Sequence, residues 1–154
     1  MPRKFLVVVD DSPEFDAALR YAARRARSTG GRVVLLRVLP DSTDEHWSGV
    51  REEIQRQQRA EAETLLSRLG EEANQRSGGQ PVFLIETGEP LDAIRKVVGE
   101  DPDIKILVLA SAGGGKAGPL VSAFLKQGAA LTGRKLPVTI VPGELTDKEI
   151  EDLA

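Results

Sequence analysis

The stretch Phe5–Ser12, FLVVVDDS, decides the fold of this chain. Its first five residues are apolar and rich in β-branched side chains, which is typical of a strand buried on both faces of a parallel sheet. Asp10 and Asp11 end the apolar run, and Ser12 and Pro13 then suit the N-cap and the first position of a helix. A buried strand that leads directly into a helix predicts the first half of a right-handed βαβ unit.

The same alternation of strand and helix continues along the chain. We expect further strands at 33–39, 82–85, 104–109 and 138–141, each a short apolar run. Four helices are expected: one from Pro13 to Gly30, one ending at Ser77, one opening at Pro90 and one from Pro119 to about Thr132. The polar stretch 41–59 carries no clear pattern. The expected fold is therefore α/β, with a five-stranded open parallel sheet between two layers of helices.

The C-terminal end of the chain carries a precise helix-start signal. Thr146 and Glu149 have the spacing of a capping box, and Leu145 and Ile150 stand where a hydrophobic staple would lie. No linker or repeat interrupts the sequence. We therefore expect one domain over residues 1–154, with 144–154 as a short helical tail.

Composition narrows the classes of function. The chain has no cysteine, which excludes disulfides and thiolate metal sites and fits a reducing compartment. A formal net charge of −3 argues against general binding of nucleic acid or membrane surfaces. The apolar run that ends before Asp10 is too short for a signal peptide or a membrane span. We expect a cytoplasmic protein that binds neither nucleic acid nor membrane.

Charge is distributed unevenly along the chain. No Asp or Glu occurs between Ile104 and Gly143, although five basic residues do: Lys105, Lys116, Lys126, Arg134 and Lys135. Two interpretations remain open, a solvated basic face and a local potential that favours an anion.

Two segments leave strands at the edge where open parallel sheets bind ligands. One is Asp10-Asp11-Ser12, and the other is residues 111–118, SAGGGKAG, after the fourth strand. A helix beginning at Pro119 would direct free backbone N–H groups and its positive dipole end at an anion, aided by Lys116. We therefore predict a small anionic ligand bound by Gly113, Gly114, Gly115, Lys116 and Gly118.

Neither standard phosphate motif is complete in this loop. Gly113, Gly115 and Gly118 form G-x-G-x-x-G, but no acidic residue before Glu144 could bind a ribose. The Walker A pattern fails because no Ser or Thr follows Lys116 to hold magnesium.

Two other groups of residues keep alternative interpretations. Asp10 and Asp11 form either a carboxylate pair for Mg²⁺ or acid–base chemistry, or a polar strand end and a helix-entry charge. His46, the single histidine, lies beside Trp47 in the polar stretch. That pair is either a loop with a hydrophobic anchor or a flap over the strand ends.

Several motifs together resemble the universal stress protein family. They are Val7–Ser12 followed by an Ala-rich helix, Leu35-Leu36-Arg37-Val38, Thr87-Gly88-Glu89-Pro90, and Leu136–Val141. The resemblance covers residues 3–143 and implies the strand order 3-2-1-4-5, dimerisation and a role in stress survival. Strand five would be a sheet edge without charged residues, so we expect a homodimer formed partly through it.

Some members of that family bind ATP through a Gly-x2-Gly-x9-Gly-(Ser/Thr) signature after strand four. Two registers of that signature are conceivable here: Gly115, Gly118 and Gly128 followed by Ala129, or Ala110, Gly113 and Ala123 followed by Phe124. In both registers the residue expected to contact phosphate is apolar. The resemblance still places Asp10 and Val38 beside a nucleoside. We therefore assign no certain cofactor, name ATP or AMP as candidate ligands, and expect weak or no ATP binding.

Two functions from different classes follow. The first is a universal-stress-type binding module that acts in stress response as a homodimer without catalysis. The second is an adenine-nucleotide-binding protein with slow hydrolase or phosphotransfer activity that uses Asp10 and the glycine loop. Mg²⁺-dependent turnover would distinguish the second function from the first.

Overall fold

The computed structural model describes residues 3–10, 12–40, 48–112, 118–127 and 134–154. The strands are β1 (Lys4–Val9), β2 (Arg32–Leu39), β3 (Val82–Thr87), β4 (Ile104–Ser111) and β5 (Val138–Pro142). The helices are α1 (Phe15–Thr29), α2 (Ser48–Ser77), α3 (Pro90–Glu100), α4 (Pro119–Gln127) and α5 (Asp147–Leu153).

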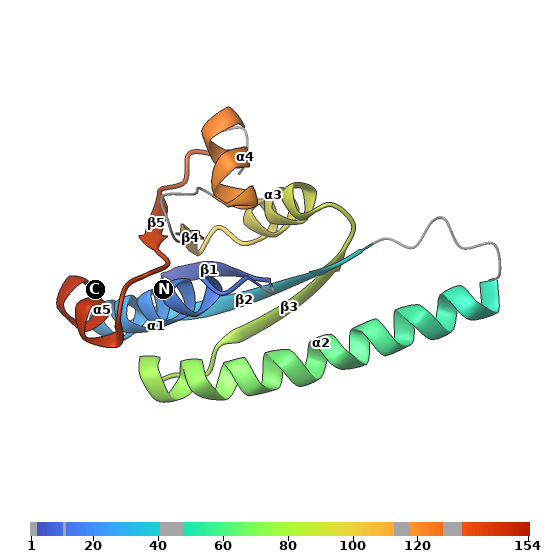
Figure 1. The fold of residues 1–154 in the computed structure, drawn as a ribbon, viewed down its shortest axis with the longest axis horizontal. Coiled ribbons are helices and arrows are strands. Elements are labelled where there is room, and N and C mark those ends of the chain that lie inside the picture. The colour runs from blue at the N-terminus through green and yellow to red at the C-terminus, as the bar shows by residue number, and fades with distance from the viewer. Residues whose placement is uncertain (1–2, 11, 41–47, 113–117, 128–133) are drawn as a thin grey trace.

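The strands form one sheet in the order β3-β2-β1-β4-β5, and every neighbouring pair is parallel (Figure 1). This confirms the predicted fold class and strand order. β1 lies at the centre, where Val7 pairs with Leu35 of β2 on one side and with Val108 of β4 on the other. Since helices cover both faces of the central strand, its continuous apolar run needs no polar residue.

Two hydrophobic clusters, one on each face, make up the core. On one face Phe5, Val7 and Val9 pack with apolar side chains of α1, α2 and α5. On the other face Leu6 and Val8 pack with side chains of α3 and α4. Consecutive residues of β1 therefore enter opposite clusters, as the alternation of side chains along a strand requires.

The predicted start of the first helix was wrong. α1 begins at Phe15, and Ser12 belongs to a turn before it. Ser12 donates its backbone N–H to Asp10 Oδ1 at 3.0 Å and its hydroxyl to the same oxygen. The Ser12 side chain therefore bonds to the preceding carboxylate and does not cap the helix. The N–H of Phe15 bonds to the Ser12 carbonyl oxygen at 3.3 Å, which closes the turn.

The predicted start of the fourth helix is confirmed. α4 begins at Pro119, and Gly118 precedes it with a φ of 82°. The Ser122 N–H donates to the Gly118 carbonyl oxygen at 3.0 Å, the first bond of the helical ladder. The predicted helix end near Thr132 lies outside the described residues.

α2 begins earlier than the apolar stripe of its sequence indicates. It starts at Ser48, within the stretch that showed no pattern. Figure 1 shows that its N-terminal part extends past the ends of the strands. Among the described residues of α2, the buried apolar side chains are Ala62, Leu66, Leu69 and Ala73, from the middle of the helix onward. Because the N-terminal part has no sheet beneath it, that part needs no apolar face.

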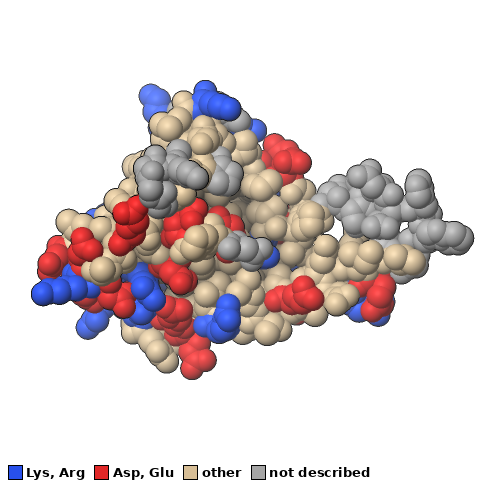
Figure 2. Space-filling model, in the orientation of Figure 1, with Lys and Arg blue, Asp and Glu red and all other residues tan. Residues whose placement is uncertain are grey.

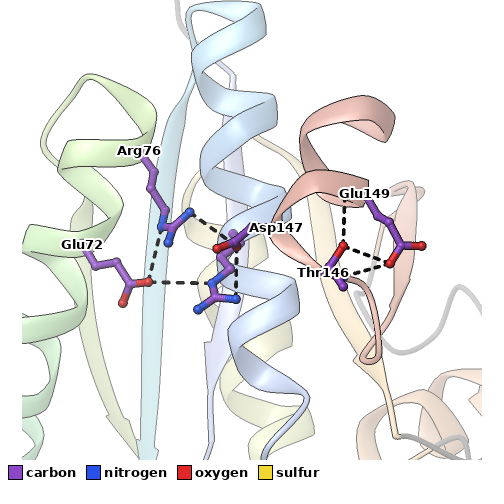
Figure 3. Close-up of polar contacts among 6 residues, drawn as sticks. Glu72, Arg76, Thr146, Asp147 and Glu149 are labelled. Atoms are coloured by element: carbon purple, nitrogen blue, oxygen red, sulfur yellow. Dashed lines mark hydrogen bonds and ion pairs between the residues drawn. The ribbon is translucent and has the colours of Figure 1, made fainter.

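The tail forms α5, which packs against α1. Thr146 and Glu149 make the predicted capping box, with the Glu149 N–H donating to Thr146 Oγ1 at 3.3 Å (Figure 3). Ile150 is buried in the hydrophobic cluster on the α1 face of the sheet, called the α1 cluster below. Asp147 pairs with Arg20 of α1 at 3.1 Å and with Arg76 of α2 at 3.7 Å, so the tail joins three helices (Figure 3). In the described part of the chain, no helix has the length and apolar character of a membrane span.

Candidate functional site

The strand order reverses between β1 and β4, and a cavity lies at the carboxyl ends of these two strands. The chain leaves β1 toward α1 on one face of the sheet and leaves β4 toward α4 on the other. Their diverging connections enclose a cavity of about 20 Å³, at the place where open α/β sheets bind ligands. The described residues that line the cavity include Asp10, Ser12, Glu14 and Phe15, together with residues at the end of β4 and the start of α4.

Asp10 lies on this cavity and is held in place locally. Its Oδ1 accepts both the backbone N–H and the hydroxyl of Ser12, as described above. Two donors on one oxygen restrict the carboxylate to one orientation at the cavity. Asp10 thus lines the cavity, and its role as a site residue stays a prediction.

Glu14 is the lining residue that sequence reasoning missed. It is the N-cap residue of α1 and makes no side-chain cap hydrogen bond. It is half-buried and lines the cavity, and its Oε1 lies 3.6 Å from the position that a Cβ would take at Gly118. The available signal was an acidic residue in the turn that follows the central strand.

Gly143 fixes the position of Glu14 from the other side. The Gly143 N–H donates to the Ser111 carbonyl oxygen at 3.0 Å, so the segment after β5 lies on the end of β4. A Cβ at Gly143 would stand 2.5 Å from Glu14 Cβ and 2.5 Å from that carbonyl oxygen. The absence of a side chain therefore permits a close approach of three segments at one rim of the cavity.

The remaining predicted residues do not all meet at the cavity. Gly118 lines it beside Asp10. Val38 lies on the neighbouring strand β2, level with Asp10, because Val9 pairs with Arg37. Its side chain packs against the hydrophobic cluster that includes α3 and α4, and it does not line the cavity. Gly113, Gly114, Gly115 and Lys116 lie outside the described residues, as do Asp11, His46 and Trp47. Their predicted roles stay predictions.

Arg37 is a cation near this edge of the sheet that was not predicted as a site residue. Its guanidinium donates to the Val9 carbonyl oxygen at 3.1 Å. It lines a separate groove between the end of β2 and α2, together with Leu39 and Gln58. This groove lies on the opposite face of the sheet from α4.

Two charged side chains line the described part of the cavity, Asp10 and Glu14, and both are carboxylates. Figure 2 shows Lys and Arg at the top of the molecule, over α4, and several Asp and Glu side chains lower on the same face. The described part of the cavity is therefore electronegative. In the described residues, no three His, Asp or Glu side chains gather in a way that could hold a metal ion.

Arg134 is one of the five basic residues between Ile104 and Gly143, and it contacts the backbone of the fold. Its guanidinium donates to the carbonyl oxygens of Val98 at 3.3 Å, Asp101 at 3.1 Å and Ile104 at 2.6 Å, at the opposite end of β4. Lys4 pairs with the Asp101 carboxylate at 2.7 Å. Partial burial tends to raise the pKa of Asp101, but Lys4, the Asp103 N–H and Arg134 together hold that pKa below its ordinary value.

The register of the ATP signature that uses Ala110, Gly113 and Ala123 is incompatible with the structure at its third position. Ala123 and Phe124 lie inside α4, where backbone N–H groups belong to the helical ladder, and Phe124 packs against the core. That register therefore provides no third loop position for a phosphate. The other register depends on Gly128 and Ala129, outside the described residues.

An open parallel α/β sheet with a cavity at its switch point is typical of proteins that bind small molecules beyond the strand ends. The model of the universal stress protein family matches residues 1–130, and the chain belongs to this family. The predicted resemblance is thus confirmed. Among proteins with curated functional descriptions, none matches the chain significantly.

Solved structures share the fold. The universal stress protein UspA from Lactobacillus plantarum is 20% identical, with 90% of this chain and 97% of that chain covered and a TM-score of 0.72. A universal stress protein in complex with cAMP is 16% identical, with coverages of 93% and 98% and a TM-score of 0.62. The protein from Archaeoglobus fulgidus in complex with dAMP is 22% identical, with coverages of 92% and 98% and a TM-score of 0.60.

Proposed function

We propose that this chain is a cytoplasmic, non-catalytic stress-response module that binds a small adenine-containing ligand in the cavity between β1 and β4. The observation that carries the proposal is the Asp10 carboxylate, which is held in one orientation at the switch point of the sheet, on a cavity of about 20 Å³. An oriented carboxylate can accept hydrogen bonds from an amino or hydroxyl group of a nucleoside. The complexes of two relatives with cAMP and dAMP support an adenine ligand.

Binding to an adenine monophosphate is favoured over binding to ATP. The described lining offers carboxylates and no cation to a triphosphate. Ala110, at the end of β4, stands where the family signature has its first glycine, as the resemblance implies. The ligand class is therefore one in which adenine and ribose provide most of the contacts.

Equilibrium dialysis with AMP, dAMP, cAMP and ATP tests this function. We expect at least one monophosphate to bind and Asp10→Ala to abolish that binding. Asp16→Ala is the control, since Asp16 is an exposed carboxylate on α1 and does not line the cavity. If no adenine compound binds, the proposal is wrong. Mg²⁺-dependent release of phosphate from ATP would favour the hydrolase alternative.

The homodimer is proposed to form through β5. This strand is an edge of the sheet, it contains no charged residue, and Ile140 on it is 37% exposed. An uncharged edge with unpaired backbone groups favours pairing with a second copy. Light scattering at micromolar concentration should give twice the chain mass, and Ile140→Lys should give the monomer mass. A monomer for the unmodified chain would refute the dimer.

A further inference from the structure

The carboxylate of Glu14 lies at the start of α4, the place in this fold where an anionic ligand group would be expected. Glu14 Oε1 is 3.6 Å from a Cβ built on Gly118, the residue before the helix. The first N–H groups of a helix and its dipole attract negative charge. Here a side chain of the protein itself provides that charge.

The turn that carries Glu14 cannot easily move away from this position. Its Cα and Cβ lie against Gly143, at 3.3 Å and 2.5 Å from the position of a Cβ there. Gly143 is in turn bonded to Ser111 at the end of β4. Behind the turn, Phe15 is buried in the core. An incoming phosphate would therefore meet the Glu14 carboxylate instead of displacing the segment.

We propose that Glu14 is a specificity-determining residue that makes the cavity select adenine ligands by their charge, favouring adenosine and AMP over ATP. Asp10 lines the same cavity and adds a second negative charge. Each phosphate placed near α4 thus faces repulsion from carboxylates a few ångströms away. The adenine and ribose of the ligand carry no negative charge and do not meet this repulsion.

The size of the effect follows from Coulomb's law. Two like charges a few ångströms apart in a partly solvated site repel enough to change an affinity by about fivefold to about a hundredfold. Repulsion of this kind weakens as ionic strength rises. Discrimination against ATP should therefore be strongest at low salt.

The inference rests on the proposed function, because it requires an adenine ligand in the cavity. The experiment is equilibrium dialysis of adenosine, AMP and ATP against the full chain and two variants. Glu14→Gln keeps the shape of the side chain and removes its charge. Asp16→Asn removes the same charge from an exposed position on α1 that does not line the cavity, and so controls for net charge.

For the unmodified chain we expect ATP to bind at least about tenfold more weakly than adenosine at low salt. Glu14→Gln should tighten ATP about fivefold or more and leave adenosine within about twofold. Asp16→Asn should change the ratio of the two affinities little. Adenosine binding with the same ATP discrimination in Glu14→Gln would overturn the role of Glu14 and leave the proposed function standing. If no adenine compound binds any of the three proteins, both are refuted.

Discussion

Gly143→Ala tests whether the close approach at the rim of the cavity is real. The added Cβ would stand 2.5 Å from the Ser111 carbonyl oxygen and 2.5 Å from Glu14 Cβ, and neither atom is at the far end of a flexible side chain. Backbone must therefore shift by nearly an ångström. Such overpacking costs about 1–3 kcal/mol, and the smaller entropy of the unfolded alanine chain offsets about 0.4–1 kcal/mol. The expected net loss in the free energy of unfolding is about 1–2 kcal/mol.

Gly99→Ala is the matched control for this variant. Gly99 lies in α3, and a Cβ there would meet nothing within 4 Å. The same chemical change should stabilise the protein by up to about 1 kcal/mol, because alanine favours a helix over glycine. Urea unfolding followed by circular dichroism gives both values on one scale. A Gly143→Ala midpoint at or above that of the unmodified chain would refute the steric reasoning, provided that Gly99→Ala is stabilised.

Further predictions concern the tail and the amino end of the sheet. Ile150→Ala should lower the free energy of unfolding by about 2–3 kcal/mol, because Ile150 is 2% exposed in the α1 cluster. A loss below about 1 kcal/mol in urea unfolding would mean that α5 is loosely packed. Thr146→Ala should cost about 1 kcal/mol by removing the capping box, and a neutral result would contradict it. The lowered pKa of Asp101 means that its pairing with Lys4 stabilises the fold above the unfolded pKa of about 4 and is lost as pH falls through the folded pKa. The stability difference between the unmodified chain and Asp101→Asn should therefore shrink from about pH 6 to about pH 3, and a constant difference would refute this.

Much of the fold could be predicted because burial leaves a periodic record in the sequence. The run that forms β1 is apolar at every position since both faces are covered, and its residues divide between the two core clusters. The capping box of Thr146 and Glu149 was predictable for another reason: its hydrogen bonds join residues three apart. The same short range explains the error at Ser12, where the Asp10 carboxylate is an equally local and stronger partner.

The site was only partly predictable from the sequence. The edge of the sheet and the place of Asp10 follow from strand order and from the rule for open sheets. The position of Glu14 does not, because it depends on Gly118 and Gly143, which are far away in the chain and come within a few ångströms only after β4 and β5 are paired. Arg134 is similar: its charge left both a solvated basic face and an anion site open, but folding brings it to three backbone carbonyl oxygens at the other end of β4.

These cases share one physical cause. Hydrophobic burial is summed over many residues, so the pattern of a strand or helix survives in the sequence whatever its neighbours are. The effect of a single charge depends on the few atoms that lie around it, and its energy falls off within several ångströms in a screened medium. Which atoms those are is decided by backbone packing between distant segments, here by glycines that let three of them approach one another. The architecture could therefore be inferred from residue patterns, whereas the two carboxylates of the described cavity lining come together only in the folded chain.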